Sequence, residues 1–389
     1  MKEKLSILIV SGVVLGLLVT ACAPKPAAPE KVIKIGVVGP LTGDFAMVGT
    51  SQLTGAEMKA DEINAAGGDI RIELLSEDDA SNCDQSVNAT TKLITQEGAH
   101  VILGACNSPC ALAMVPVTEK HKTPQFTFGV GVAITEQGSD WIFRVALTCA
   151  AQAKELAQFA VKELGHTKFA VMYTDDEYGA SCANGFKDAL IEMDMEPVAF
   201  LSFPRGDKEF SGQLATVQGS GATAMYVTGD VAGSALVAKQ VMDFGLDLQL
   251  LGDTGNASPR FAELAGEASV DTMVVEPFTP ADPDPKTQEF VAQYLEKYDR
   301  EADGWVAEMY DTVGLIYEAV AEADKAGKID WGSPESIRQA IHDYAVGLTA
   351  DSPYVGVLPG IYFTETGDAY FPLYKVRFKE GGAKEILAQ

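Results

Sequence analysis

Positively charged residues are scarce in this sequence. It has 29 lysine and arginine residues against 55 aspartate and glutamate residues, and its formal net charge is −26. A surface of this sign repels the phosphates of nucleic acids and the headgroups of anionic lipids. The charge therefore argues against nucleic acid as a partner, although a local pocket can still oppose the overall sign.

The usual sequence signatures of catalysis are also missing. There is no Gly-x-Ser-x-Gly elbow, no Gly-x-x-x-x-Gly-Lys-Ser/Thr phosphate loop and no His-Glu-x-x-His zinc motif. Gly129-Val130-Gly131 begins like a dinucleotide-binding fingerprint, but the third glycine is absent. The histidines stand where helices are expected to end, a place where they stabilise the helix dipole: His100, His121, His166 and His342. We therefore expect no enzyme activity, no catalytic residues and no cofactor.

Long apolar segments are absent apart from one at the start of the chain. Lys2 and Lys4 precede the apolar run Leu5–Val19, and small residues after this run lead to Cys22. This is the layout of a secretory signal peptide over residues 1–21. The alternative is an uncleaved transmembrane anchor, but about 15 apolar residues are short for a hydrocarbon core of ~30 Å.

The end of this segment, Val19-Thr20-Ala21-Cys22, resembles the lipobox of bacterial lipoproteins. The resemblance implies that Cys22 is lipidated and becomes the mature N-terminus. Prolines at 24, 26 and 29 make residues 22–31 a semi-rigid tether. We therefore expect an extracytoplasmic body that a lipid anchor holds at the cell membrane, on the periplasmic or outer cell-surface side.

The remaining chain alternates between strand-like and helix-like segments. A body of about 360 residues exceeds one hydrophobic core, which predicts two lobes. The alternation begins at Val32 and starts again after residue 150. It predicts an α/β fold with two Rossmann-like lobes, each a parallel sheet flanked by helices. The expected strands are Val32–Val38, Ile70–Ser76, Val101–Gly104, Pro124–Phe128, Phe169–Tyr173, Val198–Phe203, Ala224–Thr228 and Leu248–Leu251.

Polar, glycine-rich loops follow these strands in both halves of the chain. Ligands of open α/β sheets lie beyond the carboxyl ends of the strands, so one cleft between the lobes is expected. Two acidic clusters, 77–79 and 175–177, also follow strands. They could bind a cation or cap the next helix, and their spacing favours capping. The loops are 39–49, 105–109, 129–133, 173–179, 228–233 and 252–256.

Five of the six cysteines remain once Cys22 is assigned to lipid. In an oxidising compartment cysteines form disulfides before they bind metals, and an odd number leaves one of them free or paired elsewhere. Cys106 and Cys110 lack the histidine or second close pair that would complete a zinc site. No metal site is therefore expected.

Three stretches resemble the type I periplasmic binding proteins, the branched-chain amino acid receptors of ABC importers. They are Lys34–Gly68, which includes Gly39-Pro40-Leu41-Thr42-Gly43, then Asp78–Cys106, and Tyr173–Phe186. The resemblance extends from Val32 to about Phe378. It implies two lobes joined by three crossovers, near 146–149, 276–279 and 346–350. Lobe 1 would comprise residues 32–147 and 277–348, and lobe 2 residues 148–276 and 349–389.

The resemblance also implies a disulfide between Cys83 and Cys106, with Cys110 as the competing partner. Cys149 and Cys182 both lie near starts of helices of the second lobe, and whether they pair stays open.

In the family, hydroxyls and backbone amides of the first lobe hold the α-carboxylate of an amino acid. An acidic residue and tyrosines of the second lobe hold its ammonium. Tyr178 matches this pattern, but other positions carry different side chains, so a ligand other than an amino acid stays open. The ligand-binding residues implied here are Asn107, Ser108, Gly129, Val130, Gly131, Tyr178, Asp230, Asp253 and Thr254.

These features together predict the substrate-binding lipoprotein of an ABC importer. Its partners would be a small-molecule solute, the membrane permease subunits and, through the lipid, the membrane; the protein is expected to be a monomer. The default solute is a branched-chain amino acid or a related carboxylate or amide. The alternatives are a sensory ligand-binding module, or a transport receptor for aromatic or short-chain carboxylic acids.

Overall fold

The computed structural model describes residues 30–43 and 45–388. The predicted signal peptide, the lipidation site Cys22 and all but the last two residues of the tether lie outside these residues. No helix within the described ranges is long and apolar enough to cross a membrane.

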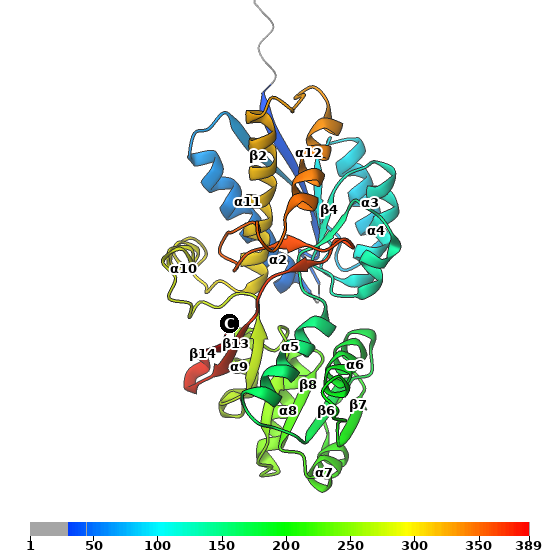
Figure 1. Ribbon diagram of the computed structural model, residues 1–389, viewed down its shortest axis with the longest axis vertical. Helices are drawn as coiled ribbons and strands as arrows, with labels where there is room; N and C mark the ends of the chain where they lie inside the picture. Colours follow the sequence, from blue (N-terminus) through cyan, green and yellow to red (C-terminus); the bar gives the residue numbers. More distant parts are fainter. Residues whose placement is uncertain (1–29, 44, 389) are drawn as a thin grey trace, which may run out of the picture. The chain divides into compact units, whose positions relative to one another are not determined.

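The first sheet has five strands in the order β2-β1-β3-β4-β5. β1 runs parallel to β3, which runs parallel to β4, and β4 is parallel to β5. Ile33, Ile35 and Val37 alternate along β1 and belong to a core cluster that also contains residues of α2 and α11. The opposite face of the sheet packs against α3 and α4 (Figure 1). The strands are β1 (Lys31–Gly39), β2 (Ile70–Asp78), β3 (Val101–Leu103), β4 (Gln125–Thr127) and β5 (Ile142–Arg144).

The second sheet has seven strands in the order β14-β13-β10-β9-β8-β6-β7. The five strands β10, β9, β8, β6 and β7 are parallel to one another. β13 pairs antiparallel with β10, and β14 pairs antiparallel with β13 at the edge of the sheet. The strands are β6 (Phe169–Thr174), β7 (Ala199–Phe203), β8 (Ala224–Thr228), β9 (Gln249–Gly252), β10 (Met273–Glu276), β13 (Tyr374–Phe378) and β14 (Lys384–Ala388).

Helices cover both faces of each sheet, and the inner strands β1, β6 and β8 bury side chains on both of their sides. In β6, Phe169 and Val171 belong to the cluster that contains residues of α5 and α6, whereas Ala170 and Met172 face α8 and α9. The predicted α/β fold with two helix-flanked parallel sheets is confirmed. The helices are α2 (Ala46–Ala65), α3 (Cys83–Thr95), α4 (Ser108–Lys120), α5 (Cys149–Lys162), α6 (Glu177–Ile191), α7 (Ser211–Ser220), α8 (Val231–Asp243), α9 (Pro259–Ala265), α10 (Pro285–Tyr298), α11 (Gly304–Lys325) and α12 (Pro334–Gly347).

The chain passes from the first sheet to the second after β5, and returns after β10. The third crossover differs from the prediction. Beyond α12 the chain stays on the first lobe, where the Asp311 carboxylate of α11 accepts backbone N–H groups of Val357 at 2.9 Å and Leu358 at 2.7 Å. The short hairpin β11 (Tyr362–Phe363) and β12 (Ala369–Tyr370) follows, and Phe363 stacks edge-on against Phe143. The chain therefore crosses after β12, and not at 346–350.

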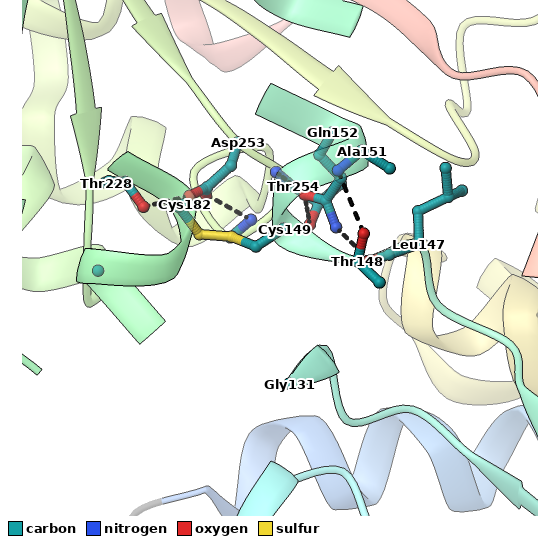
Figure 2. Close-up of a disulfide and its surroundings, with 12 residues drawn as sticks. Gly131, Leu147, Thr148, Cys149, Ala151, Gln152, Cys182, Thr228, Asp253 and Thr254 are labelled. Carbon is teal, nitrogen blue, oxygen red and sulfur yellow. Dashed lines mark hydrogen bonds between the residues drawn. A yellow bond between two sulfur atoms is a disulfide. The ribbon is translucent and has the colours of Figure 1, made fainter. Parts of the chain in front are cut away.

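Two disulfides form among the described residues, and one of them corrects the sequence prediction. Cys83 pairs with Cys110, at a Cα–Cα distance of 4.3 Å, so the expected bond between Cys83 and Cys106 is wrong. The reason is that Cys83 begins α3 and Cys110 lies in the first turn of α4, and these two helices pack side by side. Cys106 precedes α4 and is a free thiol. The second disulfide joins Cys149, the first residue of α5, to Cys182 in the second turn of α6 (Figure 2).

Candidate functional site

A cavity of about 320 Å³ lies where loops of both sheets meet the crossover segments. The first sheet contributes Phe128 and Val130 from the loop after β4, and the second contributes Thr254 and Ser258 from the loop after β9. The first crossover adds Ala146. Further walls come from the start of α5, the segment after β10, the first turns of α11 and the residues before β14: Gln152, Ala257, Pro259, Glu276, Pro277, Phe278, Pro280, Ala281, Glu301, Ala302, Asp303, Gly304, Trp305, Glu308, Gly382, Ala383 and Lys384.

Thr254 lies in this wall and is held there by Gln152 (Figure 2). The Thr254 hydroxyl donates to the Gln152 side-chain oxygen at 2.9 Å, and the Thr254 N–H donates to the same atom at 3.3 Å. The Gln152 side-chain amide donates to the carbonyl of Leu147 at 2.9 Å. Gln152 therefore ties a cavity residue of the second lobe to the first crossover.

Asp253, next in the chain, has no access to the cavity. Its carboxylate is fully buried and accepts hydrogen bonds from the Thr228 hydroxyl at 2.5 Å and the Gly255 N–H at 3.0 Å. Tyr178 also donates to it, and burial together with the charge of Asp253 raises the pKa of Tyr178 well above its usual value. Both residues were predicted to bind ligand, but here they bind each other and stabilise the loops after β8 and β9.

Asp230 is the N-cap of α8. Its carboxylate accepts the Gly233 N–H at 2.9 Å, and its other oxygen lies 3.7 Å from a guanidinium nitrogen of Arg205. The same Arg205 forms an ion pair with Asp176, the N-cap of α6. The acidic cluster 175–177 thus includes a helix cap, as its spacing predicted. In Asp230, one oxygen caps α8, and the other faces Arg205 at ion-pair distance without a hydrogen bond.

In the first lobe, the predicted residues gather around the start of α4. Asn107 is the N-cap residue of α4 but makes no side-chain cap hydrogen bond; its oxygen accepts from the Cys106 thiol at 3.6 Å. The Ser108 hydroxyl accepts the Gly131 N–H at 2.9 Å. A Cβ on Gly131 would lie 2.9 Å from the Cβ of Ser108, which explains why a glycine stands there.

The amides of this loop are less available than the sequence predicted. The Gly129 N–H donates to the Thr127 hydroxyl at 3.2 Å, and the Gly131 N–H is taken by Ser108. Of the nine predicted ligand residues, Val130 and Thr254 line the cavity. Asn107, Ser108, Gly129 and Gly131 surround the neighbouring start of α4.

The acidic side chains of this cavity were not among the ligand-binding residues predicted from the sequence. Glu276 ends β10 and forms an ion pair with Lys384, while Asp303 and Glu308 come from the start of α11. The signal that could have revealed Glu308 is its context. It stands in an apolar helical sequence, Trp305–Tyr310, in which a carboxylate is out of place unless it has a specific role.

One group of potential metal ligands occurs among the described residues, namely Cys149, Cys182 and Asp253. The two sulfur atoms are joined in a disulfide and therefore offer no thiolate. Metal binding requires the thiolate form of cysteine, so the group does not constitute a metal centre.

A family model described as periplasmic binding protein matches residues 32–383. The chain belongs to this family. The Leu/Ile/Val-binding protein homolog 3 of Brucella melitensis is 26% identical over 347 residues, which cover 88% of this chain and 90% of that protein. The family membership predicted from the sequence is confirmed, and it gives the chain a solute-binding role.

Solved structures show the same fold over nearly the whole chain. The leucine binding protein LivK of Thermotoga maritima is 26% identical with a TM-score of 0.76, covering 92% of this chain and 98% of its own. The substrate binding protein LivJ of Streptococcus pneumoniae, solved in complex with isoleucine, is 25% identical with a TM-score of 0.78, covering 92% and 99%. The cavity described above therefore belongs to a fold that binds solutes.

Proposed function

We propose that this protein is the extracytoplasmic receptor of an ABC importer and that it binds a branched-chain amino acid in the cavity between the two sheets. The observation that carries the proposal is the composition of the cavity wall. Loops at the carboxyl ends of strands from both sheets line it, together with two of the crossover segments. A solute held there bonds to both lobes at once, so it favours their closure by hinge motion.

The walls of the cavity suit a small solute with an apolar side chain. Phe128, Phe278 and Trp305 supply aromatic surface, and Val130 supplies aliphatic surface. Burial of a leucine-sized side chain against such surface is worth about 1.5–3 kcal/mol. Affinity for the solute would then come from this apolar contact and from a few polar groups that fix its orientation.

The carboxylate of the solute is assigned to the start of α4. Asn107 and Ser108 lie at this helix N-terminus, where backbone N–H groups and the helix dipole favour a negative charge. The N-cap residue Asn107 makes no side-chain cap hydrogen bond there. Asn107 also carries a side-chain amide that can donate to a carboxylate.

A thermal-shift panel tests the proposal. It should contain leucine, isoleucine and valine, together with benzoate, short-chain acids and amides, each tested with the full mature body. A ligand at ~100 times its dissociation constant adds about 2.7 kcal/mol of stability. We expect the three branched-chain amino acids to raise the melting temperature; a shift with benzoate alone would replace the amino acid with an aromatic acid.

The proposal includes the lipid anchor and the partner. We propose that Cys22 is the lipidated N-terminus of the mature chain, that the protein acts as a monomer, and that the closed form binds the permease subunits. Tethering raises the effective concentration of the receptor at these subunits. A Cys22→Ser variant should partition into the aqueous phase of a detergent extraction, whereas the wild type should enter the detergent phase; equal partitioning would contradict lipidation.

A further inference from the structure

One buried carboxyl group in the cavity wall has no partner among the described residues. Glu308 lies in the second turn of α11, its side chain is only 5% exposed, and it lines the cavity. Its carboxyl group makes no hydrogen bond and no ion pair with any described residue. A buried carboxylate without a partner costs free energy in the folded protein. A buried ionisable group that faces a cavity is therefore a candidate for contact with a ligand.

The other carboxylates that line the cavity are not available in this way. Glu276 is ion-paired with Lys384 through Oε2, and only its Oε1 makes no hydrogen bond. Asp303 caps α11, since it accepts the Val306 N–H at 3.0 Å and the Ser51 hydroxyl at 2.9 Å. Glu301 is unpaired but exposed to solvent at the rim. Among the described residues that line the cavity, Glu308 is thus the one carboxyl group that is both buried and unpaired.

We propose that Glu308 binds the ammonium group of the solute, so that the protein selects small solutes in which a primary amine accompanies an apolar side chain. This inference rests on the proposed function and specifies the ligand contact. The acids that the sequence offered for this role do not line the cavity: Asp253 is held by internal hydrogen bonds, and Asp230 caps α8 and faces Arg205. The helix α11 supplies the carboxylate in their place.

The surroundings of Glu308 favour a cation. Phe128, Phe278 and Trp305 line the same cavity, and aromatic faces attract an ammonium group. The charged groups around the cavity are Glu276, Lys384, Asp303 and, at the rim, Glu301. The helix α2, which packs against α11, adds Lys59 and Glu62, but these are bonded to each other at 2.9 Å. Of the four acidic residues that line the cavity, only Glu276 has a lysine partner, Lys384. The lining therefore carries more acidic than basic groups.

The binding reaction releases a proton. Burial, aided by the nearby charge of Asp303, raises the pKa of Glu308 to about 8, so in the empty cavity at neutral pH the group is a carboxylic acid. When the ammonium enters, the carboxylic acid transfers its proton to solvent, and the carboxylate accepts an N–H of the cation. One proton leaves for each solute bound. Affinity should therefore rise with pH, by up to tenfold per unit between pH 6 and 7.5.

Calorimetric titration of the full protein with three probes tests this inference. The probes are L-leucine, 3-methylbutylamine, which lacks the carboxylate, and 4-methylpentanoate, which lacks the amine. The variant is Glu308→Gln, which keeps the size of the side chain but cannot ionise. We expect the variant to bind leucine at least tenfold more weakly at pH 8, equivalent to about 1.4 kcal/mol. It should also lose the pH dependence and the proton release, both seen as dependence on buffer ionisation.

The matched control is Glu322→Gln, a change of the same kind at an exposed position of the same helix α11, outside the cavity lining. It should bind leucine like the wild type at every pH, and the melting temperatures of both variants should show that they are folded. Equal leucine affinity and equal pH dependence in Glu308→Gln and wild type would overturn the role of Glu308 and leave the receptor function intact. Tighter binding of 4-methylpentanoate than of leucine would overturn the selection for an amine. A wild type that binds none of the probes contradicts the branched-chain receptor itself, and the role of Glu308 falls with it.

Discussion

The Gln152 side chain bonds Thr254 in the cavity wall and the Leu147 carbonyl in the first crossover, at 2.9 Å in both cases. Residues on the cavity surface are therefore linked by one side chain to the segment that joins the lobes. A solute that contacts Thr254 acts on a loop whose position is tied to the hinge. The same side chain is buried, so its two hydrogen bonds are made without competition from water.

Replacing Gln152 by alanine should weaken solute binding. The change removes the acceptor of the Thr254 hydroxyl and the donor to Leu147, and it costs about 1–3 kcal/mol of stability because buried polar groups lose their partners. We expect leucine binding to weaken roughly tenfold, since the loop after β9 loses its fixed position. Calorimetry with leucine measures this effect.

Gln240→Ala is the control for this change. Gln240 also makes two backbone hydrogen bonds, accepting from the Phe210 N–H and donating to the Lys208 carbonyl, both at 2.8 Å, but it does not line the cavity. The Gln240→Ala variant should have a lower free energy of unfolding but an unchanged affinity for leucine. Equal losses of affinity in both glutamine variants would show that binding follows general stability and not the link to the hinge.

The cysteine pairing gives a second prediction. Non-reducing peptide mapping should find Cys83 joined to Cys110 and Cys149 joined to Cys182, with Cys106 as a thiol. The disulfide of the first lobe spans 27 residues and contributes about 3–4 kcal/mol on the chain-entropy model. Cys110→Ser should lower the free energy of unfolding by that amount.

Cys106→Ser serves as the matched control, because it removes a thiol from the same loop without removing a crosslink. Its free energy of unfolding should stay close to that of the wild type. Burial raises the pKa of Cys106 to about 12, so this thiol should react slowly with alkylating reagents at neutral pH in the native protein. A map that shows Cys106 in a disulfide with Cys83 would contradict the pairing.

The sequence predicted the local parts of the fold well, because they depend on local patterns. Alternation at Ile33, Ile35 and Val37 marks a strand, and the repeated βα order leads to two parallel sheets. The predicted position of the third crossover was wrong because residues after α12 are bound to the first lobe by a long-range contact. The Asp311 carboxylate accepts the N–H groups of Val357 and Leu358, which lie 46 and 47 positions later in the chain. No local pattern encodes such a contact.

The candidate site was predicted only in part for a related reason. The loops at the ends of the strands could be identified from the sequence. Some of their side chains, however, form hydrogen bonds with one another and do not face the cavity, as Tyr178 and Asp253 do. Cys106 and Cys110 are four positions apart, and the packing of α3 against α4 decides which of them meets Cys83. Glu308 reaches the cavity from α11, a helix that follows the second crossover, which loop positions alone could not reveal.

A third prediction concerns the pH dependence of stability. Burial raises the pKa of Glu308 from 4.5 to about 8 and that of Asp311 from 3.8 to about 7. Between the unfolded and folded values the native state binds more protons than the unfolded state, so stability falls as pH rises. From pH 6.5 to 8 each group lowers the free energy of unfolding by up to about 1.4 kcal/mol per unit. Urea denaturation at several pH values measures this slope.

Between pH 6.5 and 8, His100 does not contribute to the change of stability with pH. Burial lowers the pKa of His100 from 6.5 to about 4, which adds stability with rising pH, but only below about pH 6.5. Glu308→Gln should flatten the decline between pH 6.5 and 8, whereas Gln240→Ala, which removes no ionisable group, should leave the slope unchanged. A slope that is the same in both variants and in the wild type would show that Glu308 is ionised in the folded protein across this range.

The last prediction concerns Arg144, which is fully buried at the end of β5. Its Nε lies 2.8 Å from a carboxylate oxygen of Asp368, and its guanidinium also donates to the Thr135 hydroxyl at 2.8 Å. Asp368 belongs to the turn between β11 and β12, so this ion pair fastens the late hairpin to the first lobe. Asp368→Ala leaves a buried cation without its counter-charge and should cost about 3–5 kcal/mol of unfolding free energy.

Glu263→Ala provides the comparison, since it breaks the exposed ion pair with Arg260 on α9 and should cost no more than about 1 kcal/mol. The double variant Arg144→Met with Asp368→Ala separates charge from packing. It removes the stranded cation, so it should recover part of the stability lost in Asp368→Ala, as measured by chemical denaturation. A double variant that is less stable than Asp368→Ala would contradict this expectation. The Arg144 guanidinium would then stabilise the protein through its hydrogen bonds to the Thr135 hydroxyl and the Val132 carbonyl, and not through the ion pair.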